Sequence, residues 1–557
     1  MRHFLNKIPT RSFASFKPFI ANQTDIDKLN GSYKNLSGLE LTKHRGNYLN
    51  EFWKTNPYYQ FLGTSTGISA VNVVAGGMGR VGPYVGGWQI NAMKNRLQDT
   101  LPDTLHVSPE EPANCAVEVN NHLTKADQIQ HLNNQNYTRF HDCGLLADLE
   151  QGWSNPEKVR YAVKKAILNG INVIHIEDQG PFKRCGHLGD KELCPIEDYV
   201  MIMKAANFAA QELLEKGQTE NNWVRFVART DAFSAKRMLY SQNLMNPTHL
   251  DNKFIDWDRG LSPDGKYAYI KEGVNPETGK KWGLEMSIAR TAEIVKQGLA
   301  SHVWMETPNA ELTDAKDFLE GVNAELAKYD MEAKGLYNHS PSFDWDVKFY
   351  QSAKSLVDNI TQKTELKPFD SQFTLLQDLL EKEGDKIQGD DKMNADLMAS
   401  LTFAINDFHQ NRNYKNYLNE SPDNFYSYQF LKNTQFKTPY DIINDIVVEN
   451  RLKMFEPQLA SFGFNAHLIT LPEYHVMAFN MFNLAEQFQR EGMWAYVSQV
   501  QRPERIKYEE GIGYQYYKHQ TTTGTGLEAE FNKAVGSANS NILSGSTETD
   551  DSKLRNK

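Results

Sequence analysis

Short apolar runs recur along the chain, and each ends in polar or charged residues before a segment with helical periodicity. Several runs are continuously apolar, as expected for strands that are buried on both faces. The runs are Pro83–Trp88, Leu145–Asp148, Val173–Asp178, Val224–Asp231, His302–Thr307, Leu336–Ser342 and His467–Leu471. Because strands of this kind alternate with helices, the pattern predicts a parallel sheet covered by helices.

The clearest helical segment follows the second run. Ser154 or Asn155 can cap this helix, Pro156 suits its first position and Gly170 can end it. Apolar residues in between recur with the spacing of one helix face. We therefore expect an amphipathic helix that packs against the sheet.

Seven strands that each end in reactive side chains fit the α/β class, and specifically a (β/α)₈ barrel, in which functional groups gather at the carboxyl ends of the strands. An open, doubly wound sheet is the alternative, and the pattern does not place an eighth strand. A barrel needs about 250 residues, whereas the chain has 557. We predict a barrel over residues 25–531 with insertions at about 91–142, 235–285 and 346–465.

The two ends of the chain differ from this barrel in composition. Residues 1–24 are basic and contain no acid, which is typical of a mitochondrial presequence. We therefore expect the mitochondrial matrix, with the glyoxysome or peroxisome and the cytoplasm as alternatives. Residues 532–557 are polar and are predicted to form a disordered tail.

Charge and hydropathy exclude some classes of partner. The 60 basic and 70 acidic residues give a net charge of -10, which argues against nucleic acid or an anionic membrane as the main partner. No stretch reaches the roughly 18 consecutive apolar residues that a membrane-spanning helix needs. Four cysteines in a chain of this length do not indicate a disulfide framework.

The segment Lys183–His187 places two cations and a histidine beside one thiol. These neighbours are expected to lower the pKa of Cys185 and to make it a thiolate or a ready proton donor. Gly186 lets the backbone approach a ligand closely. The alternatives are an exposed basic loop with an idle thiol, or a zinc site that draws on Cys185, His187, Cys194, His141 and Cys143.

Acidic residues also gather at predicted strand ends. Asp148 and Glu150 stand two apart, so on an extended strand they share one face. Glu177 and Glu306 end later strands. Several carboxylates with open positions suit Mg²⁺ or Mn²⁺. By contrast, we expect Asp178 and Asp231 to be helix N-caps.

Groups that bind anions stand at three other strand ends. Arg229 ends the fourth run, Asn338, Ser340 and Ser342 form a turn after the sixth, and Thr470 ends the last. A guanidinium and hydroxyls together bind carboxylates well. A structural ion pair for Arg229 and a simple turn for the serines are the alternatives. Taken together, these residues predict a metal-dependent site for a polycarboxylate, with a thiol that exchanges a proton.

These motifs closely resemble those of the isocitrate lyase family. The segment Lys183–Leu188 looks like the signature hexapeptide of that family, and the remaining matches fall in the family's order. They include Ala147–Glu150, His175–Gln179, Ala228–Asp231, Trp304–Thr307, Asn338–Trp345, Leu468–His475, Asn483–Ala485 and Glu491–Met493. The form of Leu468–His475 resembles a longer branch of the family that is found in bacteria.

The resemblance implies a barrel of the phosphoenolpyruvate mutase and isocitrate lyase superfamily, assembled as a homotetramer. The reaction is the Mg²⁺-dependent cleavage of isocitrate to glyoxylate and succinate. By motif position, Asp148 is the main metal ligand, helped through water by Asp103, Glu150 and Glu177. Cys185 protonates the succinate carbanion. The implied substrate-binding residues are Gly86, Gly87, Trp88, Gly186, His187, Arg229, Asn338, Ser340, Ser342 and Thr470.

The resemblance leaves three points open. Tyr84, His187 and Glu306 are all candidates for the base that removes the hydroxyl proton. Gly86 replaces the serine of the family's Ser-Gly-Trp motif, so Gly86→Ser is expected to lower the KM for isocitrate or to raise the rate. A 2-methylisocitrate lyase and a catalytically silent paralogue are the alternative functions.

Overall fold

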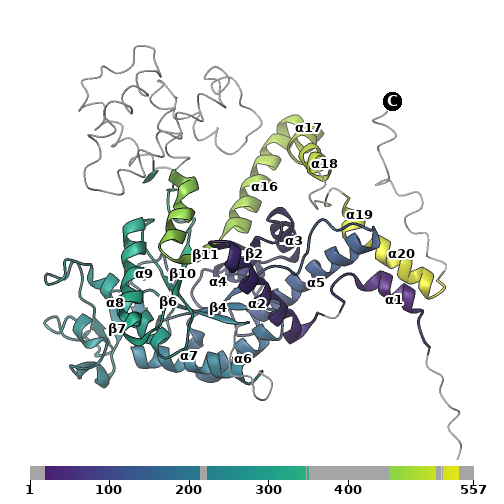
Figure 1. Cartoon of the computed structure of the whole chain (residues 1–557). Coiled ribbons are helices and arrows are strands. Elements are labelled where there is room, and N and C mark those ends of the chain that lie inside the picture. The colour runs from purple at the N-terminus through teal and green to yellow at the C-terminus, as the bar shows by residue number, and fades with distance from the viewer. Residues whose placement is uncertain are drawn as a thin grey trace, which may run out of the picture.

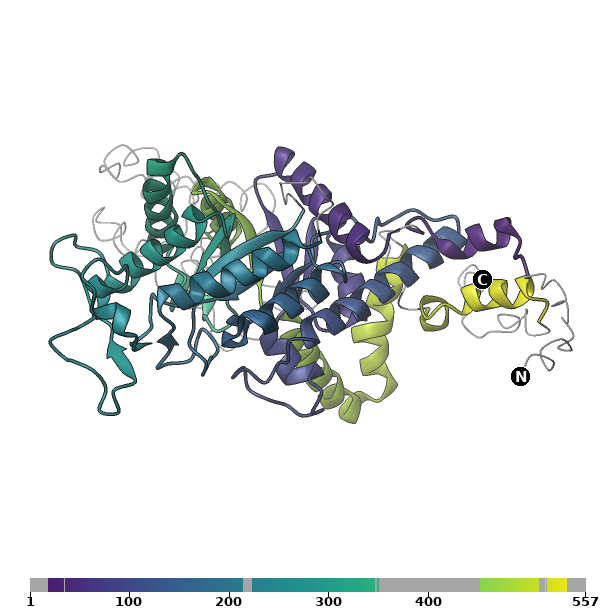
Figure 2. The same ribbon diagram turned by 90° about the horizontal axis from the view of Figure 1, so that it is seen from below.

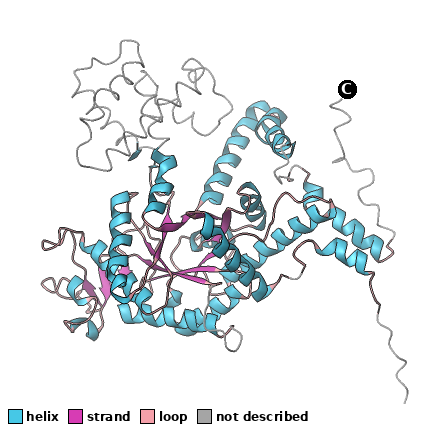
Figure 3. Cartoon of the chain, in the orientation of Figure 1, coloured by secondary structure: helices cyan, strands magenta, loops and turns pink. Residues whose placement is uncertain are grey.

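The computed structural model describes residues 19–34, 36–213, 223–345, 348–349, 451–509, 516 and 518–537. In this part of the chain, eight parallel strands close into a barrel inside a ring of helices (Figures 1 and 3). In order around the barrel the strands are β1 (Tyr59–Gly63), β11 (Phe464–Ile469), β10 (Lys334–Asn338), β9 (His302–Met305), β6 (Arg225–Thr230), β4 (Val173–Glu177), β3 (Leu146–Asp148) and β2 (Val81–Val85). The predicted (β/α)₈ barrel is confirmed, and the open sheet is wrong because β1 pairs with both β2 and β11.

Strand β1 is the eighth strand, which the sequence pattern did not place. It lies before the first predicted run, and its residues alternate between buried and half-buried. All seven predicted runs overlap a barrel strand, with shifted ends. The last run was expected at His467–Leu471, whereas β11 covers Phe464–Ile469.

Helices cover the outside of the barrel. They are α3 (Gly67–Gly76), α5 (Glu111–Leu132), α6 (Pro156–Ile167), α7 (Ile196–Gln211), α8 (Trp282–Lys296) and α9 (Leu312–Leu326). The predicted helix after Asn155 is α6. The Asn155 side chain accepts hydrogen bonds from the backbone N–H groups of Glu157 and Lys158, and Gly170 has a left-handed φ of 83°. This helix therefore begins and ends as its sequence signals indicate.

The barrel interior is a packed apolar core, with one end closed by helix α2 (Gly38–Thr55). Leu49 of α2 packs with Tyr59 and Val173, which begin β1 and β4. Helix α2 therefore covers the amino-terminal end of the strands. The carboxyl ends stay free for function.

The first two predicted insertions contain regular structure. Residues 91–142 include α5, which packs against α1 (Gln23–Asn30) and α20 (Thr525–Ala534) as an extension on one side of the barrel (Figure 2). Residues 235–285 include the 3₁₀ turns η3 (Gln242–Met245) and η4 (Asn252–Phe254) and two strands of a small sheet at the opposite end. That sheet consists of β5 (Glu192–Leu193), β7 (Arg237–Leu239) and β8 (Tyr267–Tyr269). Most of the third insertion, 346–465, lies outside the described residues.

After β11 the chain leaves the barrel through a helical arm. This arm contains α16 (Pro472–Glu491), α17 (Met493–Tyr496), the π-helical turn η6 (Val497–Gln501) and α18 (Arg502–Glu509), and it projects away from the strands (Figure 1). The chain then continues through α19 (His519–Thr522) to α20. Helix α20 runs to Ala534, into the tail predicted from residue 532; residues 1–18 and 538–557 lie outside the described chain. Among the described helices, none combines the length and apolarity needed to cross a membrane.

Candidate active site

A cavity opens at the carboxyl ends of the barrel strands. Its lining contains most of the residues that the sequence singled out: Tyr84, Gly86, Trp88, Asp103, Asp148, Cys185, Gly186, His187, Arg229, Trp304, Glu306, Asn338, Ser340, Ser342, Thr470 and Leu471. Gly87, two residues after the end of β2, contacts this group, since its N–H donates to Asp148 Oδ2 at 3.1 Å. Glu150 and Glu177 are fully buried next to the lining residues. The structure thus brings the predicted site residues together, and their roles stay predictions.

Four carboxylates meet around one lysine at the floor of this cavity. Lys183 Nζ lies 2.7 Å from Asp103 Oδ1 and 3.7 Å from Glu177 Oε1, and it also pairs with Glu150. Asp148 is held by the N–H of Gly87 and by that of Glu150, which donates to Oδ1 at 2.7 Å. Residues from three separate loops and strands therefore point their charges at one small volume.

Asp148 and Glu150 reach this volume by a different route from the one predicted. They do not share a strand face, because β3 ends at Asp148 and Glu150 has a left-handed φ of 53°. A non-glycine residue in that region is strained by about 1–3 kcal/mol and is held there by its surroundings. The turn, rather than the pleat of a strand, aims the two carboxylates at each other.

These acids outnumber the lysine that contacts them, and burial and neighbouring charges shift their pKa values. Burial raises the pKa of Glu150 well above its usual value, and it raises the pKa of Glu177 to about 8 against the opposing charges of Arg229 and Lys183. Burial would also raise the pKa of Asp148, but the charges of His175, Lys183 and Arg229 lower it to about 2. Among the described residues, Glu150 Oε1 has no hydrogen-bond partner. Oxygen ligands, excess negative charge and a free carboxylate oxygen all fit a divalent cation such as Mg²⁺.

The expectation that Cys185 has a lowered pKa is wrong. Burial, followed by the charge of Asp103, raises the pKa of the Cys185 thiol to about 11. Of the two flanking cations, Lys183 is engaged by carboxylates and Arg184 bonds to the Gly189 carbonyl in an exposed position. Cys185 is therefore a protonated thiol at neutral pH.

Arg229 and His187 both contact the carboxylate of Glu306. Arg229 lies 3.0 Å from Glu177 Oε2 and 3.5 Å from Glu306 Oε2, and His187 Nε2 lies 3.2 Å from Glu306 Oε1. Burial alone would raise the pKa of Glu306, but the His187 hydrogen bond and the Arg229 charge outweigh it and lower the pKa. Glu306 is thus ionised at neutral pH. Burial raises the pKa of Tyr84, the other candidate base, well above its usual value.

Gly86 lies directly against the ring of Tyr84. A Cβ atom at position 86 would stand 2.8 Å from Tyr84 Cε1 and 3.1 Å from Cζ. Real Cβ atoms do not approach other atoms this closely, so any side chain here must displace the ring. The expectation that Gly86→Ser improves the enzyme therefore conflicts with the packing, because the Tyr84 ring fills the space a serine would need.

Three residues of the site had no assigned role in the sequence analysis. His175 lies 3.1 Å from the Tyr84 hydroxyl and 3.7 Å from Asp148 Oδ1, and burial lowers its pKa to about 4. The ring of Trp304 lies 4.5 Å from the Arg229 guanidinium carbon. Lys183 was noted only as a neighbour of the thiol. The alternation of His175 with Glu177 on β4 was the signal that placed His175 inside the barrel.

Asp178 and Asp231 are not helix N-caps, as the sequence had suggested. Asp178 accepts hydrogen bonds from Thr230 Oγ1 and Arg290 Nε, and Asp231 pairs with Lys191 at 2.8 Å and with Arg229 at 3.2 Å. All of these side chains are buried. They form a network of ion pairs behind the cavity that holds Arg229 in place.

The cysteine and histidine set proposed for zinc is not assembled in the described part of the chain. Two other groups there bring three potential ligand atoms within 4.8 Å of one another: Asp148 with His175 and Glu177, and His339 with Glu456 and His467. Neither contains a cysteine. His141, one of the proposed ligands, instead lies near Arg45 and Thr124.

Comparison with known proteins finds sequence similarity to isocitrate lyases. The model of the isocitrate lyase family matches residues 395–552. The Bifunctional glyoxylate cycle protein of Caenorhabditis elegans is 26% identical over 529 residues, or 94% of this chain and 41% of that protein. The isocitrate lyase of Halalkalibacterium halodurans is 24% identical over 528 residues, or 92% of each chain.

The chain is thus similar in sequence to members of the isocitrate lyase family. It spans less than half of the C. elegans protein but nearly all of the bacterial one. A solved structure of 2,3-dimethylmalate lyase, described as a member of the phosphoenolpyruvate mutase/isocitrate lyase superfamily, is 16% identical with a TM-score of 0.34, over 62% of this chain and 94% of that chain. The relatives indicate a lyase.

Proposed function

We propose that this chain is an isocitrate lyase that cleaves isocitrate into glyoxylate and succinate and depends on Mg²⁺. One observation carries the proposal: a single cavity holds a cluster of carboxylates, a protonated thiol and a set of groups that bind carboxylates. Isocitrate needs all three, because it is a tricarboxylate that gains a proton on carbon after its C–C bond breaks.

Asp148, with Asp103, Glu150 and Glu177, would hold the metal. When bound, Mg²⁺ (or Mn²⁺) supplies a Lewis acid that favours the alkoxide form of the substrate hydroxyl. Lys183 neutralises part of the charge of these acids and keeps them close together. The strained turn at Glu150 fixes its carboxylate before substrate enters.

The remaining wall of the cavity would bind the carboxylates of the substrate. Arg229 offers a guanidinium that is already oriented by Asp231 and Glu177. The turn after β10 presents Asn338, Ser340 and Ser342, with the Ser342 N–H donating to Ser340 Oγ at 3.1 Å. Thr470 adds a hydroxyl after β11. Groups fixed in this way stabilise the charge that develops on the succinate half.

Proton transfer completes the reaction. The C2–C3 bond breaks as the C2 hydroxyl gives up its proton to a base and becomes the carbonyl of glyoxylate. The bonding electrons stay on C3, and the Cys185 thiol delivers its proton there to form succinate. Because Glu306 is ionised and Tyr84 is protonated, the pair of Glu306 and His187 suits the base better than Tyr84 does.

Assembly and location are further parts of the proposal. Helix α16 is fully described and contains no buried residue, although it carries the exposed apolar side chains Val476, Met477, Met481, Phe482 and Phe488. Covering this surface with other copies of the chain is consistent with a homotetramer. The basic residues 1–24 favour mitochondrial import, which a fluorescent protein fused behind them tests directly.

The metal requirement can be tested at Asp148. We expect Asp148→Asn to abolish Mg²⁺-dependent cleavage of isocitrate while the circular dichroism spectrum stays that of the wild type, because the amide loses the charge that binds the cation. Asp256→Asn, in the half-buried loop beside β8 and outside the cavity lining, is the matched control and keeps full activity. Wild-type activity that persists in excess EDTA would contradict a metal-dependent reaction.

A further inference from the structure

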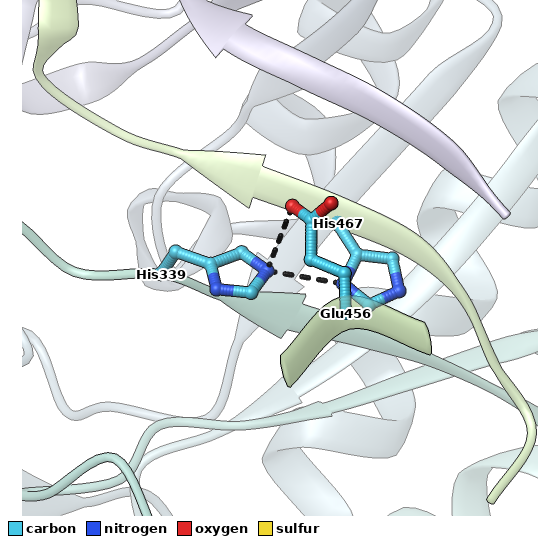
Figure 4. A group of neighbouring side chains, drawn as sticks. All are labelled: His339, Glu456 and His467. Atoms are coloured by element: carbon cyan, nitrogen blue, oxygen red, sulfur yellow. Dashed lines mark hydrogen bonds and ion pairs between the residues drawn. The ribbon is translucent and has the colours of Figure 1, made fainter. Parts of the chain in front are cut away.

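A second group of potential metal ligands consists of residues that do not line the cavity. His339 directly follows β10, His467 is part of β11, and Glu456 belongs to the helical segment at residues 451–461 that leads into β11. Figure 4 shows the two rings and the carboxylate pointing toward one another from these three elements. One potential ligand atom from each residue lies within 4.8 Å of the others.

The distances in this group match the edges of a metal coordination sphere. His339 Nε2 lies 3.0 Å from His467 Nδ1 and 3.4 Å from Glu456 Oε1. In a tetrahedral zinc site with bonds of about 2.0–2.1 Å, neighbouring ligand atoms are about 3.3 Å apart. The three side chains therefore already bring one potential ligand atom each close to a common point.

Two contacts outside the group fix the ligands in the required orientation. His467 Nε2 lies 3.2 Å from the Phe464 carbonyl, so it carries the hydrogen and leaves the Nδ1 lone pair directed at His339. Gln60 on β1 donates to the second carboxylate oxygen, Glu456 Oε2, at 2.6 Å. Histidine ligands of metals commonly use their other nitrogen in this way, and carboxylate ligands are commonly held by such hydrogen bonds.

The group contains two imidazoles and one carboxylate, that of Glu456. Among the described ion pairs, Glu456 contacts His339 and no lysine or arginine. Glu456, whose side chain is 24% exposed, leaves a path from solvent for an ion and for a water as fourth ligand.

We propose that His339, Glu456 and His467 bind one divalent transition-metal ion of the zinc type, separate from the Mg²⁺ of the active site. Two imidazoles with one carboxylate select such an ion over Mg²⁺, which prefers oxygen ligands. The ion joins β10, β11 and the helical segment before β11. Ser340 and Thr470, which follow these strands, line the active-site cavity. The ion would therefore stabilise the position of this part of the lining.

Zinc binding to the full-length protein in excess Mg²⁺ tests this proposal. After dialysis against Zn²⁺, metal analysis is expected to find one zinc per chain in the wild type, in Asp148→Asn and in His131→Asn, a control at an exposed histidine on α5. Glu456→Gln and His467→Gln are expected to lose this zinc and the rise in melting temperature that it causes. Gln60→Ala is expected to weaken zinc affinity about 10- to 100-fold, as for other outer-shell hydrogen bonds.

The same measurements give clear contradicting results. Wild-type protein that retains no zinc would show that a shared hydrogen between His339 and His467 fills the group instead. Zinc that is lost in Asp148→Asn but kept in Glu456→Gln would place the ion in the active site and overturn the proposal. If His467→Gln does not fold, Glu456→Gln alone decides, because its partly exposed side chain changes only in charge.

Discussion

At the scale of single residues, the protonation state of Cys185 depends on the direction in which the neighbouring side chains point and not only on their identity. The sequence places Lys183 and Arg184 beside the thiol, but Lys183 turns into the carboxylate cluster and Arg184 turns to solvent. Burial then outweighs their charges and keeps the thiol protonated. A protonated thiol suits the proposed role, because it must donate a proton to carbon.

This protonation state predicts slow alkylation at neutral pH. Because the Cys185 pKa is raised to about 11, its thiolate fraction is small at pH 7 and rises only as the pH approaches 11. We expect the rate of iodoacetamide labelling at Cys185, followed by mass spectrometry of its peptide, to increase up to about pH 11. An inflection at or below pH 7 would instead show that the basic neighbours control the thiol.

Gly86 makes a second prediction at this scale. A side chain at position 86 overpacks against Tyr84, which costs about 1–3 kcal/mol. Gly86→Ser and Gly86→Ala should therefore both lower kcat/KM for isocitrate, by about 5- to 150-fold. Gly76→Ala, where a Cβ meets no atom within 4 Å, is the control. An increase in kcat/KM for Gly86→Ser alone would show that the ring yields and that the hydroxyl binds substrate.

At the scale of elements, one arginine ties the small sheet region to the barrel. Arg290 on α8 donates to Asp178 behind β4 at 2.8 Å and to both carboxylate oxygens of Asp251 in the insertion at 2.8 and 2.9 Å. All three side chains are fully buried. Removing one partner of such a group leaves the others charged and without compensation.

We therefore expect Arg290→Met to lower the free energy of unfolding by about 3–5 kcal/mol, since it strands two buried carboxylates. Urea unfolding measured by circular dichroism gives this value. Arg160→Met on α6, which removes an exposed pair with Glu212, serves as the control and should change the free energy far less. Equal effects of the two substitutions would mean that the buried network contributes no more than a surface pair.

The elements also show how far the sequence alone can lead. Continuous apolar runs located seven barrel strands, and Asn155 and Gly170 located a helix, because these signals depend only on neighbouring residues. Strand β1 was not predicted, because a short stretch with alternating burial gives only a weak hydrophobic pattern. The turn that brings Asp148 close to Glu150 was not predicted, because local spacing does not specify turn conformation. The ion pairs of Lys183 were not predicted either, because they join segments that are far apart in the sequence.

At the scale of the whole molecule, the projecting arm after β11 is the feature that the single chain does not explain. In a complete barrel the last helix packs on the strands, whereas α16 extends away from them (Figure 1). Its apolar side chains are exposed along the helix, with Phe482 at 69% exposure. A helix of this kind is stable when another subunit covers it.

We expect Phe482→Glu to shift the protein toward smaller assemblies, because it places a charge in the surface that we propose to be covered. Light scattering coupled to size-exclusion chromatography gives the mass directly. Met245→Glu, at an apolar residue in the small sheet region that is 61% exposed, should leave the mass unchanged. A wild-type protein that elutes as a monomer would contradict the proposed tetramer.

The most direct test of the account is the reaction of the purified chain with isocitrate and Mg²⁺. Glyoxylate and succinate are expected in equal amounts, with a higher kcat/KM than for 2-methylisocitrate. Cys185→Ser should lose nearly all of this activity, whereas Cys194→Ser should keep it. A higher kcat/KM for 2-methylisocitrate would contradict isocitrate as the substrate. The absence of cleavage of either compound by the wild-type protein would contradict the proposed lyase reaction itself.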